Sequence, residues 1–74
     1  MLQTGDSGPD VANLQNQLDK LGSTTTWVPV TGVYDIRTAE AVAYVQSELH
    51  ITDDPQGVCG PTTAAAISTL AARG

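Results

Sequence analysis

The sequence predicts an all-α fold, a small three-helix bundle that forms a single domain over residues 1–74. Three stretches place apolar residues at intervals of three and four, which is the spacing of one helical face. Each stretch opens with residues that favour a helix start. The last two stretches and the loops before them also match each other in register, so we expect an internal pseudo-repeat of loop–helix units. A chain of 74 residues has room for only one core.

The first helix is predicted over residues 8–21. It opens with Gly8-Pro9-Asp10, because proline suits the first helical turn and an aspartate is favoured at the positive end of the helix dipole. Gly22 is expected to end it with a positive φ. Residues 23–31 follow as a structured loop, since Pro29 removes a donor that a strand would need.

The second helix is predicted over residues 35–49, with Asp35 as its N-cap and His50 in the left-handed region just after it. The third is predicted over residues 60–72, where Gly60-Pro61 repeats the opening of the first helix. The expected core combines the apolar stripes of all three helices with one valine from each repeated turn: Val11, Leu14, Leu18, Leu21, Val33, Val42, Val45, Leu49, Val58, Ile67 and Leu70.

The internal repeat pairs residues 32–42 with residues 57–67. Glycine, valine, threonine and two alanines recur at equivalent places. Each copy reads as a turn that leads into a helix: a glycine for unusual backbone, an inward apolar residue, a cap, and a threonine early in the helix. Two copies are too few for a solenoid, so the repeat indicates one pseudo-symmetric domain.

Five motifs follow one another along the chain: Gly5-Asp6-Ser7-Gly8-Pro9, Leu14-Gln15-Asn16-Gln17-Leu18, Gly32-Val33-Tyr34-Asp35-Ile36-Arg37-Thr38, Ala41-Val42-Ala43-Tyr44-Val45-Gln46 and Gly57-Val58-Cys59-Gly60-Pro61-Thr62-Thr63. In this order and at nearly this spacing they resemble the peptidoglycan-binding domain family, which is found beside cell-wall amidases, lysozymes and carboxypeptidases. The similarity covers nearly the whole chain. It implies a three-helix wall-binding module without catalytic machinery.

Several positions depart from the family pattern. Thr31 and Gln56 stand where the family usually has an aspartate, Asp35 replaces a glycine, and Val45 replaces an aromatic residue. The connector after the second helix is also longer than usual, with His50 in place of a glycine. Because loops carry the recognition surfaces of such domains, these changes bear on the ligand more than on the fold.

A site for peptidoglycan should combine hydrogen-bonding side chains with an exposed aromatic ring, because the ligand offers amides, carboxylates, hydroxyls and sugar faces. The candidate ligand-binding residues are Trp27, Tyr34, Asp35, Arg37, Tyr44 and Gln46. Arg37 and Tyr44 are the expected exposed contacts, and Arg37 could hold a carboxylate of the stem peptide with two hydrogen bonds.

Each of the other candidates also has a structural interpretation. Tyr34 occupies an inward position, and Trp27 could fill the core of a chain that has no phenylalanine. Asp35 could serve mainly as a cap. Gln15 and Gln46 could bond the backbone of the loops and fix the connectors, since buried amides need partners.

Composition excludes several classes of function. With three Lys and Arg against eight Asp and Glu, the net charge of -5 opposes binding to nucleic acid. No stretch approaches the length of apolar sequence that spans a membrane. We expect no enzyme, because Cys59 has only His50 as an imidazole partner and no carboxylate is clearly placed to orient it. We expect no cofactor and no metal: one His and one Cys are too few for zinc, and Asp53-Asp54 reads as a solvated turn rather than a calcium loop.

The function expected from these observations is non-catalytic binding of peptidoglycan, through its glycan or its stem peptide, which would target a wall hydrolase to the cell wall. The alternative is a protein-interaction or structural module that reuses the same fold, for instance in a phage particle or wall-associated assembly. Residues 1–6 lack the features of a signal peptide. We therefore expect either a domain of a longer exported protein or a short phage-borne chain that acts at the wall or outside the cell.

Overall fold

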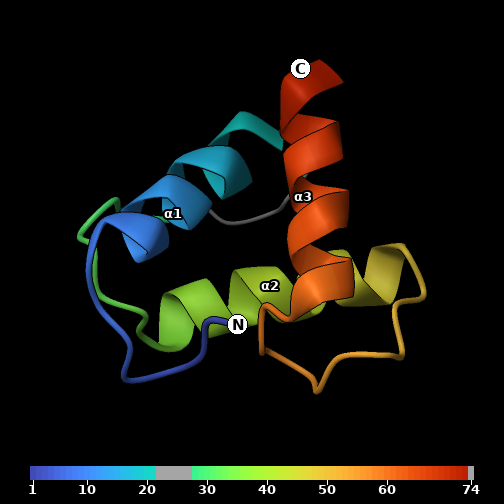
Figure 1. Ribbon diagram of the computed structural model, residues 1–74, viewed down its shortest axis with the longest axis horizontal. Coiled ribbons are helices and arrows are strands. Elements are labelled where there is room, and N and C mark those ends of the chain that lie inside the picture. The colour runs from blue at the N-terminus through green and yellow to red at the C-terminus, as the bar shows by residue number, and fades with distance from the viewer. Residues whose placement is uncertain (22–27, 74) are drawn as a thin grey trace.

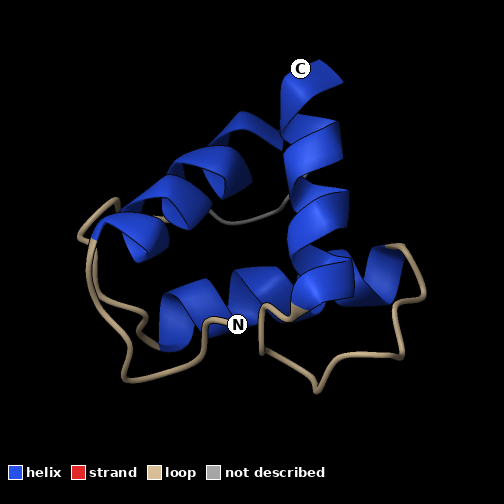
Figure 2. Ribbon diagram, in the orientation of Figure 1, coloured by secondary structure: helices blue, strands red, loops and turns tan. Residues whose placement is uncertain are grey.

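The computed structural model describes residues 1–21 and 28–73 and contains three helices, α1 (Pro9–Leu21), α2 (Ile36–Glu48) and α3 (Pro61–Arg73). Figure 2 shows that loops connect them and that no strand is present in the described part of the chain. The all-α, three-helix prediction is confirmed, and each predicted helix agrees with the observed one to within one residue at either end. Gly22 and Trp27 lie outside the described residues.

The helices surround one core. In Figure 1, α3 stands across the C-terminal half of α2, and the C-terminal end of α1 approaches the upper part of α3. α3 packs against both other helices, most extensively against α1. The connector between α2 and α3 hangs below the C-terminal end of α2 as an open loop (Figure 1).

Both ends of α2 have the conformations that the sequence predicts. Asp35 has extended backbone angles, and its carboxylate accepts a hydrogen bond from the backbone N–H of Thr38 at 3.1 Å, which is the geometry of an N-cap. This hydrogen bond is the main reason that the pKa of Asp35 is lowered. At the other end His50 has a φ of 54°, so the left-handed conformation expected after the helix is present.

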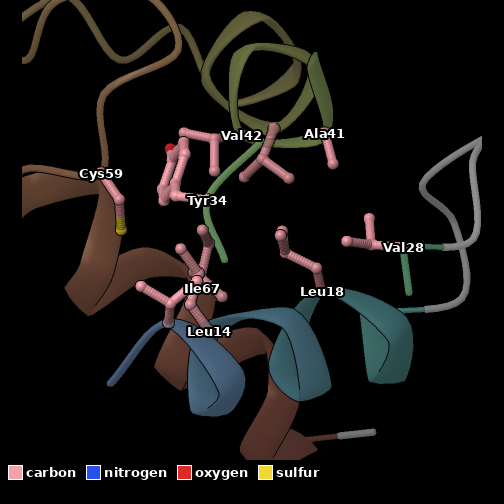
Figure 3. Close-up of a cluster of buried hydrophobic side chains, with 10 residues drawn as sticks. Leu14, Leu18, Val28, Tyr34, Ala41, Val42, Cys59 and Ile67 are labelled. Atoms are coloured by element: carbon pink, nitrogen blue, oxygen red, sulfur yellow. The ribbon is translucent and has the colours of Figure 1, made fainter. Parts of the chain in front are cut away.

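The core contains most of the predicted side chains and some that were not predicted. Figure 3 shows Tyr34 and Val42 facing Leu14, Leu18 and Ile67 across it. The buried hydrophobic residues are Val11, Leu14, Leu18, Val28, Tyr34, Ala41, Val42, Val45, Cys59 and Ile67. Leu21, Val58 and Leu70, predicted as core residues, are only partly buried.

Two predicted core residues are instead exposed. Val33 is 50% exposed and Leu49 is 42% exposed, so their assignment to the core is wrong. Neighbouring side chains of extended backbone point to opposite sides, and Val33 faces outward because Tyr34 faces inward. Leu49 lies beyond the last helical residue, as the C-cap of α2, where the helical periodicity that placed it on the apolar face no longer applies.

Two buried glutamines attach the repeated turns to the helices in the same way. The side-chain oxygen of Gln15 accepts hydrogen bonds from the backbone of Thr31 and Gly32, and its nitrogen donates to the carbonyl of Val33 and the hydroxyl of Thr38. The four distances lie between 2.9 and 3.0 Å. The interpretation that Gln15 fixes a connector is thereby confirmed.

Gln46 repeats this pattern in the second copy. Its oxygen accepts from the backbone of Gly57, and its nitrogen donates to the carbonyls of Pro55 and Val58 and to the hydroxyl of Thr63. The structural interpretation of Gln46 is also confirmed. No buried side-chain nitrogen or oxygen of the described residues lacks a hydrogen-bond partner, as a well-formed core requires.

The segment before α1 holds the two copies side by side. Leu2 exchanges two backbone hydrogen bonds with Cys59, at 3.0 and 2.8 Å. Further along, the N–H of Gly5 donates to Tyr34, and the N–H of Tyr34 donates to Asp6. Because Tyr34 and Cys59 occupy equivalent places in the repeat, this one segment pairs with both turns.

Replacing Gln15 with leucine should destabilise the fold. The change keeps the bulk of the side chain but removes four hydrogen bonds and leaves the N–H of Gly32 without its partner, so we expect a loss of about 3 kcal/mol in the free energy of unfolding. Urea unfolding followed by circular dichroism measures this. The control Asn16→Leu, on the exposed side of the same helix, should change stability by less than about 0.5 kcal/mol. Equal stability of the two variants would contradict the role assigned to Gln15.

The cap of α2 should make stability depend on pH. Because the pKa of Asp35 is lowered from its ordinary value of 3.8 in the folded state, its carboxylate stabilises the fold above that value and ceases to do so as the pH falls through the folded pKa. Asp35→Asn should therefore be less stable than the unmodified chain at neutral pH, and the difference should vanish in strong acid. Urea unfolding across the acid range tests this, with the exposed Glu40→Gln on the same helix as the control.

Candidate functional site

The connector between α2 and α3 is shaped by a carboxylate that the sequence did not reveal as a cap. Asp54 accepts hydrogen bonds from the backbone N–H of Thr63 at 2.8 Å and from its hydroxyl at 2.7 Å. It thereby satisfies a free N–H group in the first turn of α3. The prediction that both aspartates of Asp53-Asp54 belong to a solvated turn is wrong for Asp54.

Gly60 makes room for this carboxylate. A Cβ atom at position 60 would lie 2.3 Å from Oδ1 and 2.5 Å from Cγ of Asp54, far inside contact distance. In the first copy, the equivalent position is Asp35, whose own side chain caps the helix. In the second copy the capping group comes from the connector, six positions earlier in the chain.

A groove opens between the C-terminal half of α2 and this connector. Its volume is about 350 Å³, within the range of small-molecule sites. The lining residues are Ala43, Gln46, Ser47, His50, Ile51, Thr52, Asp54 and Gln56.

The lining of the groove divides into a fixed part and an available part. Gln46 and Asp54 are held by the hydrogen bonds to the connector and to α3 described above. The polar side chains of four others have no partner among the described residues and can bond a ligand: Ser47, His50, Thr52 and Gln56. Ala43 and Ile51 add apolar surface, so the groove suits a ligand with both amide and apolar parts.

The candidate residues Arg37 and Tyr44 lie on another face of α2. They are two helical turns apart, and Arg37 is exposed. The hydroxyl of Tyr44 donates to Glu48 at 2.9 Å, and this hydrogen bond to a carboxylate raises the pKa of Tyr44. Neither residue lines the groove.

Two other candidate residues have structural roles. Tyr34 is 1% exposed, and its hydroxyl donates to the carbonyl of Gly57 at 2.7 Å, so it links the two repeated turns through the core. Burial raises its pKa. Asp35 caps α2.

Of the predicted candidates within the described residues, the structure brings only Gln46 to the groove. The residues that the sequence reasoning missed come from the end of α2 and from the connector: Ser47, His50, Ile51, Thr52, Asp54 and Gln56. The signals that could have directed attention to them were the unusual length of that connector and the departures from the family pattern at His50 and Gln56. Trp27, the remaining candidate, lies outside the described residues.

Reactive and metal-binding chemistry is not favoured by the described residues. Cys59 is 3% exposed, and burial raises the pKa of its thiol, which disfavours the reactive thiolate. The structure shows no group of three or more metal-ligating side chains in residues 1–21 and 28–73. Over the same ranges, no helix combines the length and the apolar composition needed to cross a bilayer.

Comparison with known proteins identifies one family. Residues 7–67 match the family described as "Putative peptidoglycan binding domain". No curated protein and no solved structure matches the chain. The matched region contains all of α2, the connector with its groove, and the start of α3.

Asp54 and Gly60 should be energetically coupled. Asp54→Ala removes the cap of α3 and should cost about 1–2 kcal/mol in the free energy of unfolding. Gly60→Ala should cost a similar amount because its Cβ displaces the carboxylate. In the double variant the collision is absent, so the two losses should not add. Chemical unfolding of the four chains tests this, and additive losses would show that the two positions act independently.

Proposed function

The chain belongs to the family of peptidoglycan-binding domains, and we propose that it binds peptidoglycan in the groove between the end of α2 and the connector. Membership of this family indicates a binding module at the cell wall or in the extracellular space. The observation that carries the proposal is the groove itself, a concave surface whose shape is held by two hydrogen-bonded side chains on its walls, Gln46 and Asp54. A preformed site loses less conformational entropy when a ligand binds.

The chemistry of the groove supports a wall ligand. Peptidoglycan presents amide groups, hydroxyls and small methyl groups. The available hydroxyls of Ser47 and Thr52 and the amide of Gln56 can exchange hydrogen bonds with the ligand's amides, and Ile51 can receive a methyl group. All these partners are electrically neutral, so binding need not depend on attraction between the acidic chain and an anionic wall.

The role we propose is non-catalytic. The buried thiol of Cys59 is a poor nucleophile, and family members are generally binding modules. Binding would hold an attached or associated wall hydrolase close to its substrate and raise its effective concentration there.

The outer face of α2 is proposed as a second contact. The guanidinium of Arg37 is exposed and can pair with a carboxylate of the stem peptide, with Tyr44 two turns away on the same helix. Since these residues lie outside the groove, we expect them to add affinity to a ligand that the groove already holds.

One observation favours a second candidate function, docking onto a protein partner. A shallow, mainly apolar depression of about 310 Å³ lies between α3 and the end of α2, lined by Leu49, Ala65, Ala66, Thr69, Leu70 and Arg73. Exposed apolar depressions with a charged rim are typical of protein contacts. Such docking could operate in a phage particle or a wall-associated assembly.

Filling the groove should strongly weaken retention on the wall. In a sedimentation assay with insoluble sacculi at moderate salt, Ser47→Trp should bind at least about tenfold more weakly, equivalent to about 1.4 kcal/mol, because the indole occupies the space of the ligand. The matched control is Ser68→Trp, the same substitution at an exposed serine of α3 that lines neither depression.

Three results of this assay have different meanings. Loss of retention in Ser47→Trp with normal retention of Ser68→Trp supports the groove. Loss of retention in Arg37→Ala, with normal retention of Ser47→Trp, would place the binding site on the outer face of α2 instead of in the groove. A chain that stays entirely in the supernatant contradicts wall binding, and a stable complex with a protein from its native source, lost when Leu70 is replaced by aspartate, would then support the docking function.

A further inference from the structure

We infer that the groove receives the stem peptide of peptidoglycan, and specifically a segment that carries a free amino group, rather than the glycan strand. This inference rests on the proposed function and names the part of the ligand that the groove takes. Three properties of the groove lead to it: the absence of aromatic rings from its lining, its size, and the charge on its wall.

The lining offers no flat surface for a sugar ring. The apolar face of a pyranose packs well on an aromatic ring, which provides a large rigid apolar area. The described residues that line the groove include no Phe, Tyr or Trp. Their apolar part is the methyl group of Ala43 and the branched side chain of Ile51, which suit the small side chains of a peptide.

The size of the groove also suits a short peptide segment. Its volume of about 350 Å³ is near the lower end of the range for ligand sites. The hydroxyls of Ser47 and Thr52 and the amide of Gln56 lie among the lining residues and can bond the alternating N–H and C=O groups of a backbone. A glycan strand presents its amides only as isolated acetamido groups, not in the alternating order of a peptide backbone.

The charge on the groove favours an ammonium group. Asp54 accepts both hydrogen bonds from Thr63 through Oδ2, and no described residue donates to its Oδ1. Its negative charge is felt locally, since it contributes to the raised pKa of Cys59. The exposed carboxylate of Asp53 lies next to it in the chain.

Among the parts of peptidoglycan, the stem peptide is the one that supplies such an amine. The amino groups of its sugars are acetylated and neutral, whereas the diamino acid of an uncrosslinked stem carries a free side-chain ammonium. An attraction between this ammonium and the carboxylates of the connector requires no positive residue on the protein, which agrees with a chain of net charge -5.

The test uses the isotope-labelled chain and three soluble probes followed by nuclear magnetic resonance. The first probe is a synthetic lysine-containing stem pentapeptide whose N-terminus is acetylated, so that the lysine carries its one ammonium group. The second is the same peptide with its lysine also acetylated, and the third is a glycan strand from which an amidase has removed the peptides. We expect the free peptide to shift the amide signals of Ser47, Ile51, Thr52 and Gln56 in a saturable way. Acetylation should weaken binding about two- to fivefold, and the glycan should leave these signals unchanged.

A charge variant tests the same attraction from the side of the protein. Asp53→Asn should weaken binding of the free peptide about two- to fivefold at low salt and should not affect the acetylated peptide. Asp53 is exposed and makes only a long hydrogen bond, of 3.5 Å, from Thr62, so the change should leave the fold intact. The control Asp10→Asn removes the same charge from α1 and should affect neither peptide.

The outcomes separate this inference from the proposed function. Glycan strands that shift the groove signals, or intact sacculi that retain the chain while the free peptide has no effect at millimolar concentration, would overturn the stem-peptide assignment and leave wall binding in place. Equal affinity for the free and acetylated peptides would overturn the role of the amine. If sacculi do not retain the chain either, the proposed function itself fails.

Discussion

The buried amides of Gln15 and Gln46 are the interactions on which the rest of the fold depends. Each is nearly inaccessible to water, and each bonds one repeated turn to the threonine of the helix that follows it. The threonine hydroxyl in turn donates to a carboxylate, that of Asp35 in the first copy and that of Asp54 in the second. An amide, a hydroxyl and a carboxylate thus form one chain of hydrogen bonds, in which each group fixes the position of the next.

The two copies share this chain of hydrogen bonds but differ in where the carboxylate comes from. Asp35 is the residue directly before its helix, whereas Asp54 belongs to a connector that must extend away from α2 and return to reach Thr63. Because the connector extends away from α2 before it returns, a space remains between the two, and that space is the groove. The hydrogen bonds that the two copies share stabilise the domain. The longer connector of the second copy, which the first copy lacks, forms the groove.

The sequence was sufficient to predict the helices, the repeat, the cap at Asp35 and the left-handed His50, because these depend on spacing and on local backbone preferences. The sequence was not sufficient to predict features that depend on contacts between residues far apart in the chain. Val33 matched the apolar pattern of the repeat, yet the inward position belongs to Tyr34. The groove could not be predicted from residue types, since Ser47, Thr52 and Gln56 are ordinary surface residues until the returning connector places them around one space.

The contact between Gly60 and Asp54 links two positions of the sequence that could otherwise change freely. A side chain at position 60 excludes the carboxylate, and a chain without that carboxylate has no need of glycine there. If the two positions change one at a time, one of two intermediates must occur. Either α3 loses its cap because Asp54 is replaced first, or a side chain at position 60 collides with the carboxylate of Asp54. Such an intermediate is a barrier to single changes, so the shape of the groove is protected by the cost of altering either residue alone.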